Sequence, residues 1–163
     1  MTNAALAIFV ALEQSGFAAA VRQSSWLYPA ANIGHVVALV FFAGAVGVMN
    51  IRLLGGLAAT APRHVLARAR SFAIAALLGM ALTGFVLFPA EASHLVLKPV
   101  FQLKAVLVGA GLLNVAIYEV CAKRAVDGLT PGAAMPPRAK LAGVLSLGTW
   151  VAVAACGRGI GYF

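Results

Sequence analysis

Residues 28–54 read YPAANIGHVVALVFFAGAVGVMNIRLL, and this stretch decides the fold. It carries a single charged side chain, Arg52, close to its end. A helix that crosses the hydrocarbon core of a bilayer needs about 20 consecutive, mostly apolar residues. The apolar residues here follow one another without the two-residue alternation of a half-buried strand. The stretch therefore predicts a transmembrane helix.

The composition of the whole chain agrees with this prediction. The 163 residues are 63% hydrophobic and 10% charged, whereas soluble domains are about 45–50% apolar and about 25% charged. The same figures exclude a disordered chain and a disulfide scaffold. The net charge of +8 lies between the apolar runs, which argues against nucleic acid as a partner. We therefore predict an integral membrane protein in contact with the lipid bilayer.

Three more apolar stretches follow the first, and Gly- and Pro-rich breaks separate them. Backbone groups inside lipid must be hydrogen-bonded within the segment, which permits only helices or a closed barrel. Long continuous apolar runs favour helices. We predict an all-α, integral membrane four-helix bundle that forms a single domain over residues 1–163, with spans at about 28–54, 65–88, 100–121 and 141–156.

The N-terminal segment, residues 1–24, is harder to assign. Its apolar run over residues 4–12 is too short to cross a bilayer, and the polar sequence 13–16 interrupts it. We expect an interfacial helix here, with a fifth span as the alternative.

Basic residues predict the orientation, because cytoplasmic loops carry the excess of Lys and Arg. One side of the predicted bundle has only Arg22, Lys98, Lys104 and Arg158. The other side should be cytoplasmic in a bacterial inner membrane, which places the Pro89–Pro99 loop and the C-terminus on the outer face. The basic residues of that cytoplasmic side are Arg52, Arg63, Arg68, Arg70, Lys123, Arg124, Arg138 and Lys140.

Small residues and cysteines bear on how the helices pack. Pairs at four-residue spacing, such as Ala43 and Gly47, let membrane helices approach closely and leave a homo-oligomer open. Cys121 and Cys156 fall at opposite ends of the predicted bundle, too far apart for a disulfide.

Ionisable side chains inside a membrane are costly and so draw attention to function. His35 stands about 10 Å below the outer end of the first span, and Lys104 about 7–8 Å below the same face, at 1.5 Å per residue. His94, Lys98 and Arg158 are expected at that rim. Two histidines and three cations are therefore predicted to converge on the outer half of the bundle.

This convergence suits a b-type haem (haem b). A neutral imidazole is a good axial ligand for haem iron, and membrane bundles hold haem between facing helices. His35 is the main candidate ligand and His94 its candidate partner. The cations Lys98, Lys104 and Arg158 are then expected to meet the anionic propionates.

Other interpretations of the same residues remain open. His35, Glu91 and His94 suit a copper or zinc ion, and His35 with Lys104 suits a quinone headgroup or a small anion. A purely structural interpretation has the polar residues hydrogen-bonding across helices, as expected for Asn50 and Asn114. Glu119 is expected to pair with Lys123 at four-residue spacing.

The chain also resembles an uncharacterised family of small bacterial multi-helix membrane proteins, on four motifs that span nearly its whole length. A looser likeness, in architecture only, is to small b-type cytochromes and copper-resistance membrane proteins. The resemblance implies the fold and supplies no reaction. The motifs are Trp26-Leu27-Tyr28-Pro29 followed by His35, Asn50-Ile51-Arg52-Leu53-Leu54-Gly55, Pro99-Val100-Phe101-Gln102-Leu103-Lys104, and Gly157-Arg158-Gly159-Ile160-Gly161-Tyr162-Phe163.

The leading expectation is therefore a membrane electron-transfer component that binds haem b or a quinone in its outer half and meets a redox partner protein on the outer face. The first alternative is a metal-handling or small-solute transport protein. The second is a structural subunit of a larger membrane complex. No nucleophile triad or phosphate-binding glycine loop is visible, which argues against hydrolase chemistry.

Overall fold

A computed structural model describes residues 3–162 of the chain, and the side chains from residue 6 onward. Residues 1–2 of the predicted segment 1–24, and Phe163 of the C-terminal motif, lie outside the described residues. Within the described part the secondary structure is helical, without strands. The elements are α1 (Asn3–Glu13), α2 (Gly16–Gln23), α3 (Leu27–Leu53), α4 (Pro62–Leu87), the 3-10 helix η1 (Phe88–Glu91), α5 (Ala92–Leu95), α6 (Pro99–Cys121), α7 (Lys123–Asp127) and α8 (Pro137–Gly159).

The predicted four-helix architecture is confirmed. The four long helices α3, α4, α6 and α8 are each long and apolar enough to cross a membrane. Two of them begin earlier than the sequence predicts, α4 at Pro62 and α8 at Pro137. Proline fits the first turn of a helix because the amide hydrogen that it lacks has no intrahelical partner there. These helices therefore include polar first turns beyond their apolar cores.

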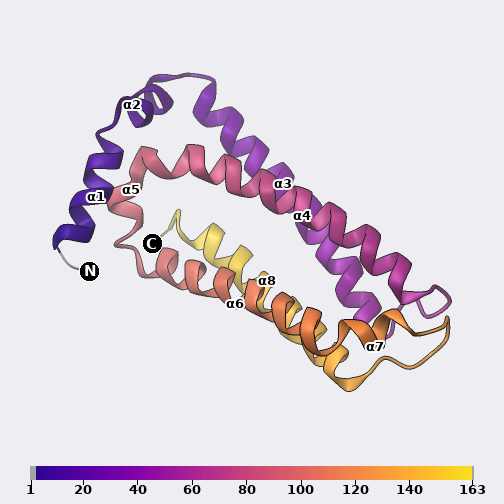
Figure 1. Cartoon of the computed structure of the whole chain (residues 1–163). Helices are drawn as coiled ribbons and strands as arrows, with labels where there is room; N and C mark the ends of the chain where they lie inside the picture. Colours follow the sequence, from indigo (N-terminus) through magenta and orange to yellow (C-terminus); the bar gives the residue numbers. More distant parts are fainter. Residues whose placement is uncertain (1–2, 163) are drawn as a thin grey trace.

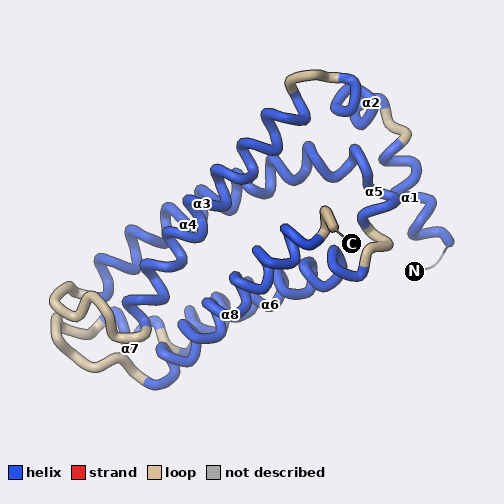
Figure 2. The backbone as a smooth tube through the Cα atoms, turned by 180° about the vertical axis from the view of Figure 1, so that it is seen from behind, coloured by secondary structure: helices blue, strands red, loops and turns tan. Residues whose placement is uncertain are grey.

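The long helices are arranged as two pairs (Figures 1 and 2). Helix α3 packs along α4, and α6 packs along α8. Contacts between α3 and α8 join the two pairs, whereas α4 and α6 barely touch. The bundle is thus closed along one side and open between α4 and α6 on the other.

Small residues allow the close approach of α3 and α4. A Cβ atom added at Gly79 would lie 3.5 Å from the Cβ atom of Ala38, and one added at Gly34 would lie 3.3 Å from a methyl group of Thr83. Such close contacts gain dispersion energy, which drives helix association in lipid. The close α3–α4 seam passes beside Thr83.

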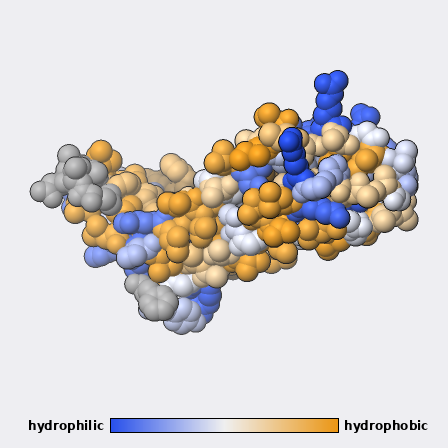
Figure 3. Space-filling model, turned by 90° about the horizontal axis from the view of Figure 1, so that it is seen from below, coloured by the Kyte–Doolittle hydropathy of each residue, from blue (hydrophilic) through white to orange (hydrophobic). Residues whose placement is uncertain are grey.

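The outside of the bundle is strongly apolar (Figure 3). Large hydrophobic side chains such as Ile33, Leu82, Phe85 and Val106 are exposed on the long helices. A soluble monomer rarely exposes so much contiguous apolar surface, whereas lipid solvates it. The molecule is an integral membrane helix bundle.

The N-terminal segment does not form a fifth continuous span. Helices α1 and α2 have 11 and 8 residues, so at 1.5 Å per residue they are about 16 and 12 Å long, well short of the about 30 Å hydrocarbon core. They pack against η1 and α5. Their packing closes what we call the N-terminal end of the bundle, and the interfacial location expected for residues 1–24 stays a prediction.

Polar contacts hold the N-terminal end together. The backbone amide and hydroxyl of Ser93 donate to Oε2 of Glu13 at 2.8 and 2.5 Å, and these hydrogen bonds lower the pKa of the Glu13 carboxyl. The Arg22 guanidinium donates to the carbonyl oxygens of Glu13 and Ala90 at 3.0 and 3.2 Å. Helices α1 and α2 are thereby tied to η1 and α5.

The opposite end, which carries α7 and most of the basic residues, is called the basic end. Arg52 is completely buried there, and its guanidinium donates to the carbonyl oxygens of Gly56 and Thr60 at 3.4 and 3.1 Å. Gly55 has a φ of +105°, a conformation that only glycine adopts readily. The α3–α4 connection therefore folds back over a buried cation.

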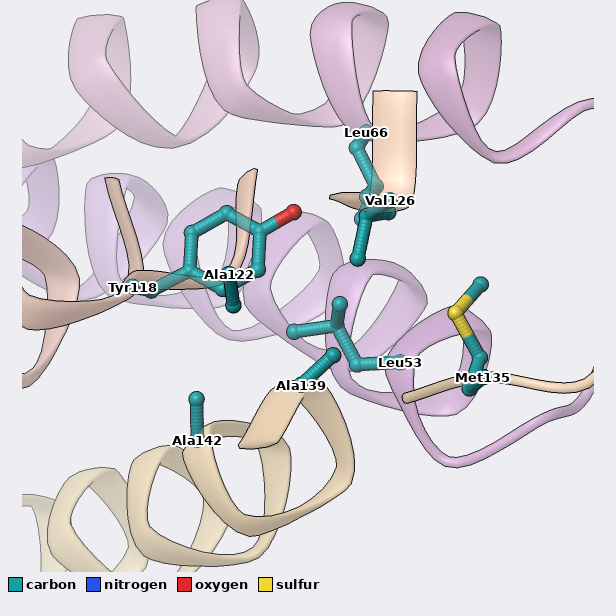
Figure 4. Close-up of a cluster of buried hydrophobic side chains, with 8 residues drawn as sticks. All are labelled: Leu53, Leu66, Tyr118, Ala122, Val126, Met135, Ala139 and Ala142. Atoms are coloured by element: carbon teal, nitrogen blue, oxygen red, sulfur yellow. The ribbon is translucent and has the colours of Figure 1, made fainter. Parts of the chain in front are cut away.

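An apolar cluster packs beside this connection (Figure 4). It joins α3, α4, α6, α7 and α8 and includes one hydroxyl, that of Tyr118. The members of the cluster are Leu53, Leu66, Tyr118, Ala122, Val126, Met135, Ala139 and Ala142.

Candidate functional site

His35 lies on α3 in the half of the bundle near the N-terminal end, facing α4. Its Nδ1 atom is 2.9 Å from Oγ1 of Thr83 on α4. A Cβ atom added at Gly84 would lie 3.5 Å from Cε1 of the imidazole. The ring is therefore held at the α3–α4 seam by a hydrogen bond to Thr83, and the lack of a side chain at Gly84 leaves room for it.

The hydrogen bonds of Thr83 assign the tautomer of His35. The Thr83 hydroxyl donates its one proton to the carbonyl oxygen of Gly79 at 2.7 Å, so it accepts from the Nδ1–H group of His35. In the neutral imidazole the other nitrogen, Nε2, then carries a free lone pair. Such an arrangement is typical of metal-ligating histidines, which usually donate their second nitrogen to a nearby acceptor.

Lys104 approaches the same region from α6. The Nζ atom lies 3.5 Å from the position that a Cβ atom at Gly157 would occupy. No described residue forms a hydrogen bond or an ion pair with this ammonium group. Lys104 thus lies against α8 in the same half of the bundle as His35, and their convergence on one site stays a prediction.

Lys98 and Arg158 lie at the same end but have partners of their own. The Lys98 ammonium donates to the carbonyl oxygen of Ile160 at 2.9 Å, where it satisfies the C-terminus of α8. The Arg158 guanidinium donates to the Tyr162 hydroxyl and stacks over that ring, 4.3 Å from its centroid. Of the three predicted cations, Lys104 is the one whose charge is uncommitted within the described residues.

The remaining predicted ligands lie on the surface of the N-terminal end. His94 is exposed on α5, and Glu91 is exposed at the end of η1. Across the described residues, no three His, Cys, Asp or Glu side chains form a group that could hold a metal ion. The structure therefore gives no support to a copper or zinc site formed by His35, Glu91 and His94.

Polar residues in the other half of the bundle differ from the expectations in part. Asn114 does hydrogen-bond between helices, donating to the carbonyl oxygen of Ala142 at 3.0 Å. The predicted pair of Glu119 with Lys123 is wrong, because α6 ends at Cys121 and Lys123 starts a separate helix. Glu119 instead pairs with Arg70 of α4.

Lys123 pairs with Asp127 of its own helix, at 2.7 Å. Asn50 was expected to form a hydrogen bond between helices, but its amide Nδ2 has no partner among the described residues.

A cavity of about 350 Å³ lies in this half, between the two helix pairs. Its lining is mostly apolar, with polar side chains from all four long helices toward the basic end. Phe42 and Trp150 form a T-shaped contact, with ring centroids 4.6 Å apart, beside it. The polar lining residues are Asn50, Arg70, Asn114, Tyr118, Glu119 and Ser146.

Two parts of these sites are not predicted by the sequence. Thr83 is one residue among many in an apolar span, and nothing in the sequence pairs it with His35. The cavity arises because α4 and α6 barely touch, which no local pattern encodes. The polar side chains of Asn50 and Tyr118, near the ends of the apolar first and third spans, are the sequence signal for this cavity.

The fold and these buried polar groups define a class: a four-span helical membrane protein with candidate sites between its helices. Within that class, the family model of DUF6644, a family of unknown function, matches residues 12–163. The chain belongs to this family, which confirms the resemblance to an uncharacterised family and adds no reaction to it. No curated protein and no solved structure matches the chain.

Proposed function

We propose that the protein is a membrane electron-transfer component that binds a b-type haem near the N-terminal end of the bundle, with His35 as the iron ligand. The observation that carries the proposal is the hydrogen bond from His35 to Thr83. In this hydrogen bond the protonated Nδ1 points toward Thr83, so Nε2 is held in one position with a lone pair that it can donate to iron. Iron in haem proteins is commonly held by such an imidazole.

Lys104 supports the same proposal by its charge. A cation in a membrane is expensive, and this one has no anionic partner among the described residues. The propionate groups of a haem are anions of the kind that such a cation binds. We therefore assign Lys104 to a propionate, and give Lys98 and Arg158 the lesser role of fixing the C-terminal end of α8.

The test is the visible absorption spectrum of detergent-purified protein, oxidised and then reduced with dithionite. The expected result is a Soret band with sharp α and β bands on reduction, lost in His35→Ala. The matched control is His64→Ala, which removes an exposed histidine at the basic end and should leave the spectrum unchanged. A colourless protein prepared with ample haem, or a spectrum that survives His35→Ala, would contradict the proposal.

Metal analysis of the same preparation separates the alternative functions. Stoichiometric copper or zinc without haem favours a metal-handling protein. A preparation without haem or metal, in which a partner protein co-purifies, favours a structural subunit of a larger complex.

We further propose that the protein lies in a bacterial inner membrane with its basic end in the cytoplasm and its N-terminal end on the outer face, where a redox partner protein would dock. The support is the excess of Lys and Arg at the basic end. In a background without Cys121 and Cys156, Ser25→Cys reports the N-terminal end and Thr130→Cys the basic end, since both positions are exposed. A membrane-impermeant maleimide should label only Ser25→Cys in intact spheroplasts. The reverse pattern would overturn the orientation.

A further inference from the structure

Two residues that line the cavity near the basic end each carry a buried hydrogen-bond donor without a partner among the described residues. Asn50 is 3% exposed and Tyr118 is 6% exposed, and both line the cavity. The Asn50 amide Nδ2 and the Tyr118 hydroxyl have no hydrogen-bond partner among the described residues. A buried donor without a partner is costly, and in native structures it usually finds one in a water or a ligand.

The charges of the cavity are already balanced. Arg70 and Glu119 line it and form an ion pair with each other. A carboxylate or a phosphate placed there would meet no uncommitted cation among the lining residues. The site therefore favours a neutral ligand that accepts hydrogen bonds, rather than a fatty acid or a phospholipid headgroup.

The mouth of the cavity faces lipid. Three lining residues at the mouth are exposed: Ile74 of α4 at 53%, and Leu112 and Val115 of α6 at 48 and 43%. The back wall is formed by α3 and α8, whose lining residues Asn50 and Ala142 are buried. Helices α4 and α6 barely touch, so the opening lies between them. An apolar molecule dissolved in the membrane can enter sideways without crossing water.

We infer that this cavity binds the ring of a membrane quinone, with its carbonyl oxygens accepting from Asn50 and Tyr118 and its apolar tail leaving between α4 and α6. A volume of about 350 Å³ lies within the range of small-molecule sites. The aromatic pair of Phe42 and Trp150 beside the cavity suits a flat ring. A quinone at this cavity gives the proposed redox function a membrane-soluble electron carrier, and this role of the quinone rests on the proposed function.

The chain offers a reporter for the test, because it has two tryptophans and only Trp150 lines the cavity. Trp26→Phe removes the other, which is 82% exposed. Decylubiquinone is titrated into this variant in detergent, with a micelle-dissolved tryptophan ester as the standard for nonspecific quenching. Saturable quenching of Trp150 is expected, and quenching that only follows the standard would overturn the inference.

Variants test the assigned contacts. Asn50→Leu and Tyr118→Phe each remove one donor with little change in shape, and each should weaken binding about 5- to 10-fold. Val115→Phe narrows the mouth at an exposed position and should weaken binding at least as much. Ile117→Phe, the matched control on the same helix, is also exposed and does not line the cavity, so it should bind like the parent. Parent-like binding by both Asn50→Leu and Tyr118→Phe would overturn the headgroup assignment.

Two further measurements separate the outcomes. Decylbenzene, which lacks carbonyl groups, should compete poorly; equal competition would show an apolar cavity without quinone selectivity and overturn the ligand class. Repeating the titration in the His35→Ala background removes any quenching by haem. Saturable binding there, with or without a Soret band in the parent, keeps the quinone inference independent of the haem proposal.

Discussion

The two ends of this bundle present opposite chemistry. Near the N-terminal end, the hydrogen bond to Thr83 uses the Nδ1–H donor of His35 and leaves the lone pair of Nε2 free. The ammonium group of Lys104, in the same half of the bundle, has no partner among the described residues. Near the basic end, Asn50 and Tyr118 are donors that lack acceptors, and the charges of Arg70 and Glu119 cancel. The difference shows that polar groups inside a membrane protein are best classified by the hydrogen-bond or charge partner that each of them lacks. We propose the first region for a haem iron with its anionic propionates, and the second for a neutral acceptor.

Packing separates the regions as well. The α3–α4 seam at His35 is closed by glycines, whereas the α4–α6 side of the cavity is open to lipid. The contact between Phe42 and Trp150 lies between the two candidate sites. Variants on each side of that contact should therefore affect one region and spare the other.

The largest effect is expected at the buried cation of the basic end. Arg52→Met removes the hydrogen bonds to the carbonyl oxygens of Gly56 and Thr60 and should lower the free energy of unfolding by about 3 kcal/mol. Thermal unfolding of the purified protein in detergent measures this. Arg63→Met, at an exposed position of the same end, should change the midpoint little. Equal midpoints for the two variants would show that Arg52 does not hold the α3–α4 connection.

The next effect sharpens the assignment of the N-terminal region. Thr83→Val keeps the shape of the side chain but removes the acceptor of the His35 Nδ1–H group, and losing such a partner lowers metal affinity about 10- to 100-fold. Haem titration, followed by the Soret band, measures the loss. Thr149→Val, in a half-buried position of α8, should bind haem like the parent. Unchanged affinity in Thr83→Val would mean that the hydrogen bond does not orient the ligand.

A smaller effect is expected at Gly111 of α6, which faces Trp150. A Cβ atom at Gly111 would lie 2.9 Å from the indole ring of Trp150. Gly111→Ala should therefore displace the ring and cost about 1–2 kcal/mol. In contrast, Gly109→Ala meets no atom within 4 Å and should be neutral or slightly stabilising, because alanine favours the helix. Thermal unfolding and the emission of Trp150 in the Trp26→Phe background report both changes, and equal behaviour of the pair would refute the close contact.

The smallest effect concerns the docking of the N-terminal helices. Hydrogen bonds from Ser93 lower the pKa of Glu13 below its ordinary value of 4.5, so the contact is fully present above pH 4.5. It is lost as the pH falls through the lower pKa of the folded state. Hydrogen exchange of the Ser93 amide, corrected for the intrinsic rate, should accelerate in that acidic range. Glu13→Gln keeps an acceptor oxygen for Ser93 but does not titrate, so it should abolish the pH dependence, while Glu91→Gln should retain it.

Much of the fold could be predicted because lipid imposes a simple rule. A run such as 28–54, with one charge, must satisfy its backbone within a helix, and the same holds for the other three runs. The sequence did not decide between an interfacial segment and a fifth span for residues 1–24. In the structure α1 ends at Glu13 and Ser15 caps α2, and both short helices pack against η1 and α5.

The candidate sites show a similar division. His35 and Lys104 could be placed in the same half of the bundle because the helical rise converts sequence position into depth. Glu119 and Lys123 could not, since their four-residue spacing suggests a pair only if one helix runs through both, and α6 stops between them. Thr83 and the cavity depend on which faces of separate helices meet.

The sequence by itself determined the class of protein, the number of long helices and the depth of each polar residue, because hydrophobicity and helical rise are properties of a single segment. Only the tertiary structure decided that Thr83 fixes the tautomer of His35, that Arg70 neutralises Glu119, and that α4 and α6 stay apart. Rotation of one helix about its axis changes its contacts and leaves the hydropathy of its sequence untouched. The chemistry of both ends therefore rests on packing between segments that are distant in the chain.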